Sequence, residues 1–175
     1  MTKVSFSVFT KPWKTQPLVE VGELVKRLGF DGIELPVRPG FQVEPENVAR
    51  DLSLAARQLA ELDISIYSVA GPTDEATIAA CAEAGVPIIR TMARISREEG
   101  YLAGEARYQR EYDSLVLLLE LYIETLFVEN HCDWFVANAV GLRSLVSKYD
   151  PKHVAAVWDA AHEALNGGLP ELAID

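Results

Sequence analysis

Carboxylate and imidazole side chains occur together at two places where a short apolar segment ends. Glu129, Asn130 and His131 close one such segment, and Asp159 closes the next, with His162 three residues later. Divalent ions such as Mn²⁺ and Mg²⁺ prefer carboxylate oxygens and accept imidazoles that converge from several elements. The residue types therefore predict an ion-binding site built around Glu129 and Asp159.

Each candidate also has an ordinary structural interpretation. An aspartate after a strand, such as Asp159, often caps the next helix. A single loop histidine such as His162 is more often hydrogen-bonded or solvated than a ligand, and Glu34 near a proline is also typical of a solvated loop. Arg90 lies in an apolar segment, where an unpaired charge is costly, so we expect it to reach an acidic partner or to face the mouth of a site.

The strands and helices that position these residues are predicted from two alternating patterns of apolar residues. Short apolar runs predict strands, and the longer stretches between them have apolar residues at helical spacing, with Pro17 and Pro45 at helix starts and Gly85 at a helix end. Thr73 is the expected N-cap of the helix that ends at Gly85. The expected strands are 3–9, 31–35, 64–69, 86–92, 124–130 and 154–159. The expected helices are 17–28, one from 45, 73–85, one ending near 122, 135–149, and a first helical turn after residues 167–170.

Six strand-then-helix units with short connections predict a parallel sheet with right-handed crossovers in a single domain over residues 1–175. Periodicity leaves two architectures open, an open doubly wound sheet and an arc of a barrel. In both, functional side chains collect at the carboxyl ends of the strands. Glu34, Arg90, Glu129 and Asp159 all lie at or near such ends.

Composition narrows the function classes. The formal net charge of −10 disfavours binding to a nucleic-acid backbone, and a small polar substrate suits the chain better. There is neither an apolar run long enough for a membrane span nor a signal-peptide pattern, which predicts a cytoplasmic protein with no membrane partner. Cys81 and Cys132 form no CxxC or zinc spacing, so two reduced thiols are expected.

Three motifs resemble those of one family. The run from Gly29 to Leu35 looks like the second-strand signature of the xylose isomerase-like barrels, the sugar phosphate isomerase/epimerase superfamily. Glu129-Asn130-His131 is similar to the fifth-strand metal motif of that family, and Asp159-x-x-His162 is similar to its sixth-strand motif. The resemblance implies a partial (β/α)₈ TIM barrel with about six units, lacking the last two and not closed by this chain alone.

The resemblance also implies roles for individual residues. Glu129 and Asp159 would be metal ligands, and Glu129 would also be a catalytic acid/base. His162 would contact substrate or the metal, and Glu34 would lie at the substrate end of the pocket. Arg90 is also predicted to bind substrate, but from its place in the apolar strand and not from the resemblance. The implied cofactor is a divalent metal ion, Mn²⁺ or Mg²⁺ first and Zn²⁺ as an alternative.

The expected function is a sugar or sugar phosphate isomerase or epimerase of carbohydrate metabolism, which moves a proton next to a carbonyl with the help of the ion. One alternative is a non-catalytic barrel fragment that needs a partner chain, either another protein or a second copy bound through open sheet edges. Another is a metal-dependent endonuclease or lyase on the same barrel, which the acidic charge disfavours.

Overall fold

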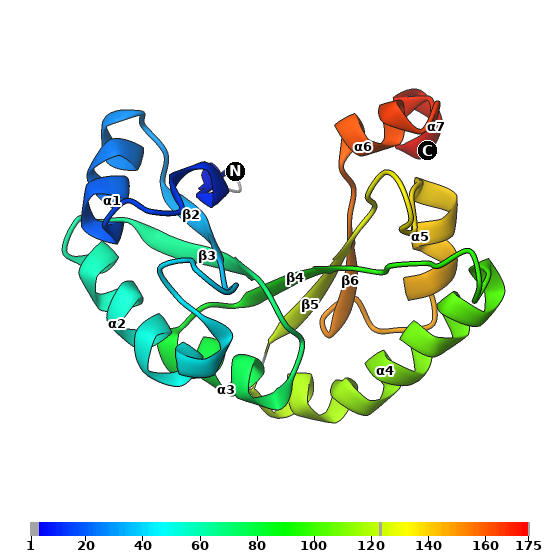
Figure 1. The fold of residues 1–175 in the computed structure, drawn as a ribbon, viewed down its shortest axis with the longest axis horizontal. Coiled ribbons are helices and arrows are strands. Elements are labelled where there is room, and N and C mark those ends of the chain that lie inside the picture. The colour runs from blue at the N-terminus through cyan, green and yellow to red at the C-terminus, as the bar shows by residue number, and fades with distance from the viewer. Residues whose placement is uncertain (1–3, 123, 175) are drawn as a thin grey trace. The chain divides into compact units, whose positions relative to one another are not determined.

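Six strands alternate with helices in the described part of the chain, residues 4–122 and 124–174 of a computed structural model (Figure 1). The strands are β1 (Ser7–Phe9), β2 (Gly32–Pro36), β3 (Ser65–Ala70), β4 (Ile88–Met92), β5 (Thr125–Glu129) and β6 (Val154–Val157). The helices are α1 (Leu18–Arg27), α2 (Val48–Ala60), α3 (Glu75–Ala84), α4 (Tyr101–Tyr122), α5 (Ala139–Val146), α6 (Ala160–Leu165) and α7 (Pro170–Ala173), with 3-10 turns η1 (Lys11–Trp13) and η2 (Pro45–Asn47). The strands follow one another in chain order in a single sheet, which confirms the predicted α/β class.

The chain divides into two compact units. Unit 1 comprises Met1–Ile89 and Tyr122–Glu124, and unit 2 comprises Arg90–Leu121 and Thr125–Asp175. The first three strands belong to unit 1, whereas β5 and β6 belong to unit 2. Among the described residues, no helix is both long and apolar enough to cross a membrane.

In unit 1, α1 and α2 bury one face each, with Val21, Val25, Leu52 and Leu59 fully buried. Each such side chain contributes on the order of 2 kcal/mol through burial. The three strands run parallel, and the close approach of β2 and β3 depends on Gly32, where a Cβ atom would lie 2.5 Å from the Ser65 carbonyl oxygen. This is the glycine of the second-strand motif, so its role here is to let two strands pack.

In unit 2, β5 and β6 pair in parallel, from Leu126 opposite Val154 to Glu129 opposite Val157. The segment that leads into β6 is fixed against α4, because the Tyr149 hydroxyl donates to the Gln109 carbonyl oxygen at 2.7 Å. The two carboxyl ends of β5 and β6 therefore stand side by side, and residues that follow them emerge at one edge of the sheet.

Several local boundaries differ from the sequence expectations. Asp74, not Thr73, caps α3, because its side chain accepts a hydrogen bond from the Thr77 amide at 2.8 Å. Helix α5 begins only at Ala139, after the N-cap Asn138, and the first strand is three residues long; residue 3 lies outside the described residues. A helix that the sequence reading missed, α6, starts directly after Asp159.

Candidate functional site

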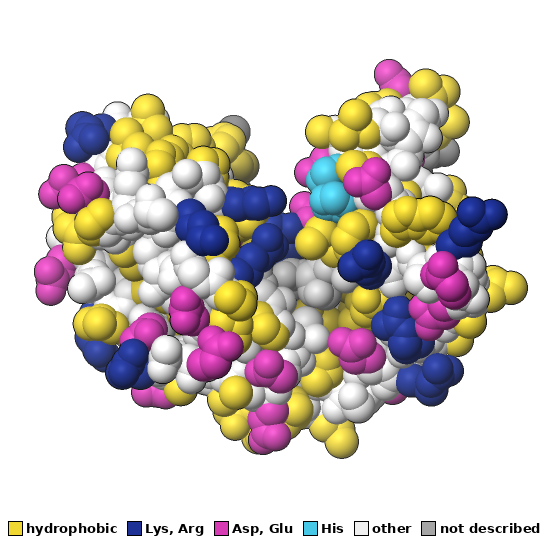
Figure 2. Space-filling view, in the orientation of Figure 1, with side chains coloured by type: hydrophobic (Ala, Val, Ile, Leu, Met, Phe, Trp, Pro, Cys, Tyr) yellow, Lys and Arg dark blue, Asp and Glu magenta, His cyan; other side chains and the backbone are white. Residues whose placement is uncertain are grey.

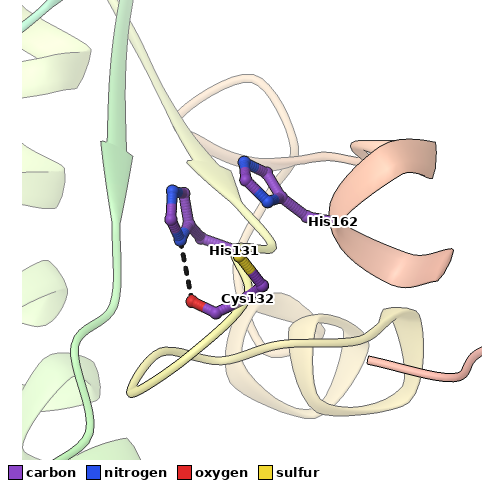
Figure 3. Close-up of side chains that lie close together, drawn as sticks. All are labelled: His131, Cys132 and His162. Atoms are coloured by element: carbon purple, nitrogen blue, oxygen red, sulfur yellow. Dashed lines mark hydrogen bonds between the residues drawn. The ribbon is translucent and has the colours of Figure 1, made fainter. Parts of the chain in front are cut away.

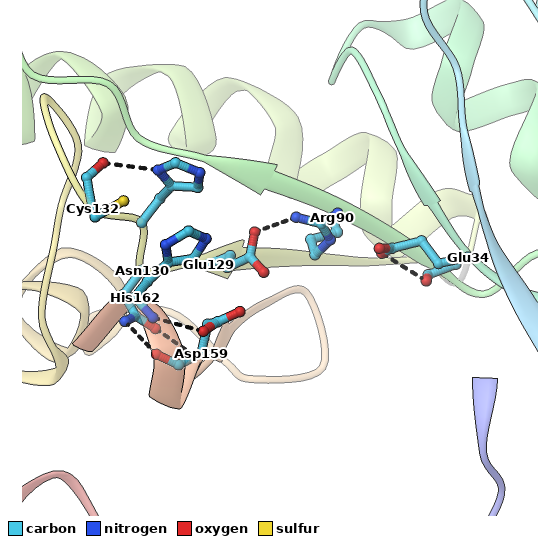
Figure 4. A network of polar contacts seen from close by, with 9 residues as sticks. Glu34, Arg90, Glu129, Asn130, Cys132, Asp159 and His162 are labelled. Atoms are coloured by element: carbon cyan, nitrogen blue, oxygen red, sulfur yellow. Dashed lines mark hydrogen bonds and ion pairs between the residues drawn. The ribbon is translucent and has the colours of Figure 1, made fainter. Parts of the chain in front are cut away.

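A buried ion pair joins two of the predicted site residues in unit 2. The Arg90 guanidinium on β4 donates to the Glu129 carboxylate at the end of β5 (Figure 4). The two side chains are each 11% exposed. Burying either charge alone would be strongly destabilising, whereas a hydrogen-bonded pair is tolerated. The expectation that Arg90 reaches an acidic partner is thus confirmed, and the partner is the proposed catalytic glutamate.

Asn130 connects the end of β5 to the end of β6. Its side chain is fully buried, accepts a hydrogen bond from the Asp159 backbone amide at 2.6 Å, and donates to the Asp159 carbonyl oxygen at 3.0 Å (Figure 4). An amide can make this reciprocal pair because it carries both a donor and an acceptor. Asn130 therefore fixes the backbone of Asp159 beside the end of β5.

Asp159 is the N-cap of α6. Its Oδ1 atom accepts a hydrogen bond from the His162 backbone amide at 2.8 Å, so the capping interpretation left open by the sequence is confirmed. This bond uses one of the two carboxylate oxygens. Capping and ligand roles are therefore compatible, and the predicted metal role of Asp159 stays a prediction.

Two imidazoles and a thiol lie together beyond the strand ends (Figure 3). Each of His131, Cys132 and His162 offers a ligand atom, and the three atoms lie within 4.8 Å of one another. The two imidazole rings stack, with centroids 3.8 Å apart and planes at 35°. Among the described residues, this group of converging metal-binding side chains includes neither Glu129 nor Asp159.

The thiol of this group, on Cys132, has a raised pKa. Partial burial and then the negative charge of Asp133 raise the pKa of the Cys132 thiol, and the sulfur lies 3.8 Å from Asp133 Oδ2. Cys132 is therefore a neutral thiol near neutral pH when no ion is bound. The sequence reading treated it as an ordinary thiol; its place directly after the Glu-Asn-His motif was the available signal.

Glu34 belongs to unit 1. Its carboxylate accepts a hydrogen bond from the Ser68 hydroxyl at 3.0 Å, and the β2–β3 register shifts between Ile33 and Glu34. A shift of this kind re-aims the following side chain. The predicted substrate contact of Glu34 stays a prediction.

Glu124 is one of two further buried glutamates, with Glu163, that the sequence analysis did not identify among the described residues. Glu124, directly before β5, is 4% exposed, and its Oε2 atom has no hydrogen-bond partner among the described residues. Desolvation raises its pKa to about 7, and burial followed by the charge of Glu124 raises the pKa of Cys81 to about 12. No pattern of spacing distinguishes Glu124, because its unusual state comes from tertiary burial.

Solved structures with similar folds have several different activities. The 3-keto-D-glucoside 4-epimerase from E. coli has a TM-score of 0.79 at 14% identity, covering 98% of this chain and 74% of its own. A family 2 AP endonuclease from Brucella melitensis has a TM-score of 0.75 at 16% identity. The match covers 97% of this chain and 74% of the endonuclease chain. The IolI protein with a bound zinc atom has a TM-score of 0.75 at 14% identity. The match covers 96% of this chain and 67% of the IolI chain.

No family model matches the sequence, and no curated protein matches it. The structural similarity extends over almost the whole chain, while the identities are too low to carry over an activity. Together with the six alternating units, it establishes the architecture that the sequence motifs predicted. The chain has the fold of the xylose isomerase-like TIM barrels, of which it forms a partial (β/α)₈ barrel.

Proposed function

We propose that this protein is a divalent-metal-dependent isomerase or epimerase of a sugar or sugar phosphate. The observation that carries the proposal is the buried Arg90–Glu129 pair at the carboxyl end of β5. Carboxyl ends of strands are where barrel enzymes build their active sites. A buried charged pair is also a poor source of stability, so its presence there favours a chemical role over a structural one.

Glu129 is the proposed base. The neighbouring guanidinium favours an ionised carboxylate, which is the form that accepts a proton from the carbon next to a carbonyl. Arg90 holds this carboxylate in place and is also the proposed contact for a substrate oxygen or phosphate, which guanidinium groups bind well. The proton returned to the other face or to the adjacent carbon gives the epimer or the isomer.

Glu129 and Asp159 are the proposed metal ligands, and the carboxylate oxygens fit Mn²⁺ or Mg²⁺ by donor chemistry. When bound, the ion supplies Lewis-acid stabilisation of the developing enediolate oxygen. His162, on the first turn of α6, is a proposed contact for substrate or the metal. The epimerase and zinc-binding neighbours support this assignment as analogies on the same fold.

A panel of ketoses and ketose phosphates, incubated with Mn²⁺ and separated by chromatography, tests the proposal. We expect product only with the metal present, and a loss of about 10²- to 10⁴-fold in rate for Glu129→Gln. Glu124→Gln is the matched control, because it neutralises a carboxylate five residues earlier that has no proposed chemical role. Equal rates for wild type and Glu129→Gln would overturn the assignment.

A metal-dependent nuclease is the second candidate, favoured by the AP endonuclease neighbour. The net charge of −10 opposes it, since phosphate-backbone binding normally needs a cationic surface. Cleavage of an abasic-site duplex by wild type but not by Glu129→Gln would favour the nuclease over the epimerase.

The fragment alternative has its own support in exposed apolar side chains near the C-terminal end of the described chain. Leu165, Leu169, Leu172 and Ile174 are 60–75% exposed. Contiguous exposed apolar surface often marks an interaction site. Light scattering at several concentrations distinguishes a concentration-dependent assembly from a monomer.

A further inference from the structure

The His131–Cys132–His162 group has the geometry of a transition-metal site separate from the carboxylates. The ligand atoms come from two elements of unit 2, the loop after β5 and the first turn of α6, and lie within 4.8 Å of one another. In a tetrahedral zinc site, bonds of about 2.0–2.3 Å place ligand atoms roughly 3.3–3.8 Å apart. Bringing the three atoms to these separations requires shifts of about 1 Å, which side-chain rotation supplies.

His131 already has the second contact that metal-binding histidines usually make. Its Nδ1 atom lies 2.8 Å from the Cys132 carbonyl oxygen (Figure 3). A carbonyl oxygen only accepts, so Nδ1 carries the proton and Nε2 presents its lone pair. Donation of the other ring N–H to a backbone carbonyl is the arrangement that orients ligating imidazoles.

His162 can present a lone pair on Nδ1 in the tautomer that carries its proton on Nε2. Its Nδ1 atom is buried and has no hydrogen-bond partner among the described residues. Buried polar atoms are nearly always bonded, so an orphan ring nitrogen beside a thiol and a second imidazole points to a ligand that the protein is built to receive.

The loop that carries two of the ligands is held rigidly. The His131 amide donates to the Val136 carbonyl oxygen at 3.1 Å, and the Val136 amide donates to the Ala93 carbonyl oxygen at 2.9 Å. The ring of Phe135 packs on His131, with centroids 4.7 Å apart. Through the Asn130–Asp159 bonds the loop is also tied to the start of α6, so the ligands are positioned before an ion arrives.

We propose that His131, Cys132 and His162 bind a divalent ion of the Zn²⁺ class, in a site distinct from the predicted Glu129–Asp159 site. A thiolate with two imidazoles selects zinc-like ions over Mg²⁺ and Mn²⁺, which prefer oxygen. Three protein ligands leave a fourth position for water or substrate, as in catalytic zinc centres. All three residues are partly exposed, and histidine reaches the molecular surface (cyan in Figure 2), so an ion can enter from solvent.

Cobalt substitution of the 175-residue protein tests this site without any assay of activity. We expect one equivalent of Co²⁺ to produce a thiolate-to-cobalt charge-transfer absorption, and one equivalent of Zn²⁺ to abolish it. Cys132→Ala is expected to lose the absorption and to weaken Zn²⁺ binding, measured by competition with a chelating dye, by at least about 100-fold. Cys81→Ala is the matched control and keeps both, because the Cys81 thiol is fully buried.

Two further variants separate this site from the proposed enzyme function. His131→Gln is expected to weaken Zn²⁺ binding, whereas His153→Gln is not. Glu129→Gln is expected to bind Zn²⁺ normally even though the proposed proton transfer is lost. Absence of the charge-transfer band in folded wild-type protein, or a Cys132→Ala variant that binds Zn²⁺ as tightly as wild type, would overturn the zinc site and leave the epimerase proposal standing.

Discussion

Two glutamates, one just before β5 and one at its last position, are both buried, yet their environments are opposite. Glu129, at the carboxyl end, is paired with Arg90. Glu124, just before the amino end, is 4% exposed with an Oε2 atom that finds no partner within the described residues, and desolvation raises its pKa to about 7. One carboxyl group has a guanidinium partner, and the other is pushed toward its neutral form by desolvation.

The difference shows that burial of a carboxyl group is not itself a sign of function. At the Glu129 end, the charged pair is followed by the Asn130–Asp159 bonds and by a cluster of imidazoles and a thiol. At the Glu124 end, the buried Cys81 thiol has a pKa raised to about 12 by its burial and by the charge of Glu124. Chemistry is therefore expected where a buried charge is partnered and surrounded by other polar groups.

Breaking the Arg90–Glu129 pair is expected to have the largest effect on stability. Arg90→Met leaves a buried carboxylate without its guanidinium, and we expect a loss of about 3–5 kcal/mol in the free energy of unfolding. The double variant Arg90→Met/Glu129→Leu is expected to recover most of that loss, because both buried charges are gone. Urea denaturation near neutral pH measures both, and a single-variant loss under about 1 kcal/mol would contradict the pairing.

Glu124→Gln is expected to remove a pH dependence of stability. The folded-state pKa of about 7 lies above the ordinary value of 4.5, so the folded protein holds the proton more tightly. Stability contributed by this group is full below about pH 4.5 and falls as pH rises toward about 7, by up to about 3 kcal/mol in total.

The Glu124→Gln variant should thus be more stable than wild type at pH about 8.5 and show a flatter profile between about pH 5 and 8. Urea titrations at several pH values measure the slope, with Glu129→Gln as the companion variant. Parallel pH profiles for wild type and Glu124→Gln would show that Glu124 is not the titrating group. The contrast between the environments of Glu124 and Glu129 would then be wrong for Glu124.

The Asn130→Ala variant tests whether the Asn130 side chain stabilises the backbone of Asp159 at the carboxyl end of β5. It removes both hydrogen bonds to the Asp159 backbone and leaves the half-buried Asp159 amide without this partner, which costs about 2 kcal/mol. Asn138→Ala is the reference change, since it removes one cap hydrogen bond at an exposed asparagine and costs about 1 kcal/mol. Thermal unfolding compares the stability of the two variants. A smaller loss of stability for Asn130→Ala than for Asn138→Ala would contradict the role of Asn130 in fixing the Asp159 backbone.

Variants of Asp159 distinguish its helix-capping role from its proposed ion-binding role, and they have the smallest expected effect on stability. Asparagine caps helices about as well as aspartate, so Asp159→Asn is expected to change stability by less than about 0.5 kcal/mol, against about 1 kcal/mol for Asp159→Ala. Both variants remove a charged oxygen ligand and are expected to weaken Mn²⁺ binding. Unchanged Mn²⁺ affinity in Asp159→Asn, measured by calorimetry, would reduce Asp159 to a cap.

Much of the fold follows from local signals in the sequence. Apolar runs gave the six strands, and Gly85 ends α3 with a positive φ of 70°, a conformation that favours glycine. The boundaries failed where two residues offered the same signal. Thr73 and Asp74 are both cap formers, and only the bond to the Thr77 amide decides between them. Helix α6 was missed because it has six residues, too few for a periodic pattern.

The site was predictable to the level of residue types at strand ends. The positions of Glu129, Asp159 and His162 follow from the order of strands, and the need of Arg90 for a partner follows from the cost of an unpaired charge. The choice of Glu129 as that partner, and the meeting of Cys132 with His162, depend on contacts between segments about 30 residues or more apart, which spacing does not encode.

Deuterium incorporation from D₂O, followed by NMR, tests the central claim most directly, because exchange reports removal of the proton next to the carbonyl without requiring the reaction to be completed. With Mn²⁺ and a ketose substrate, we predict exchange at the carbon next to the carbonyl for wild type and Glu124→Gln, and loss of exchange by about 10²-fold or more for Glu129→Gln. Exchange that persists in Glu129→Gln, or that disappears equally in both glutamine variants, would contradict the account.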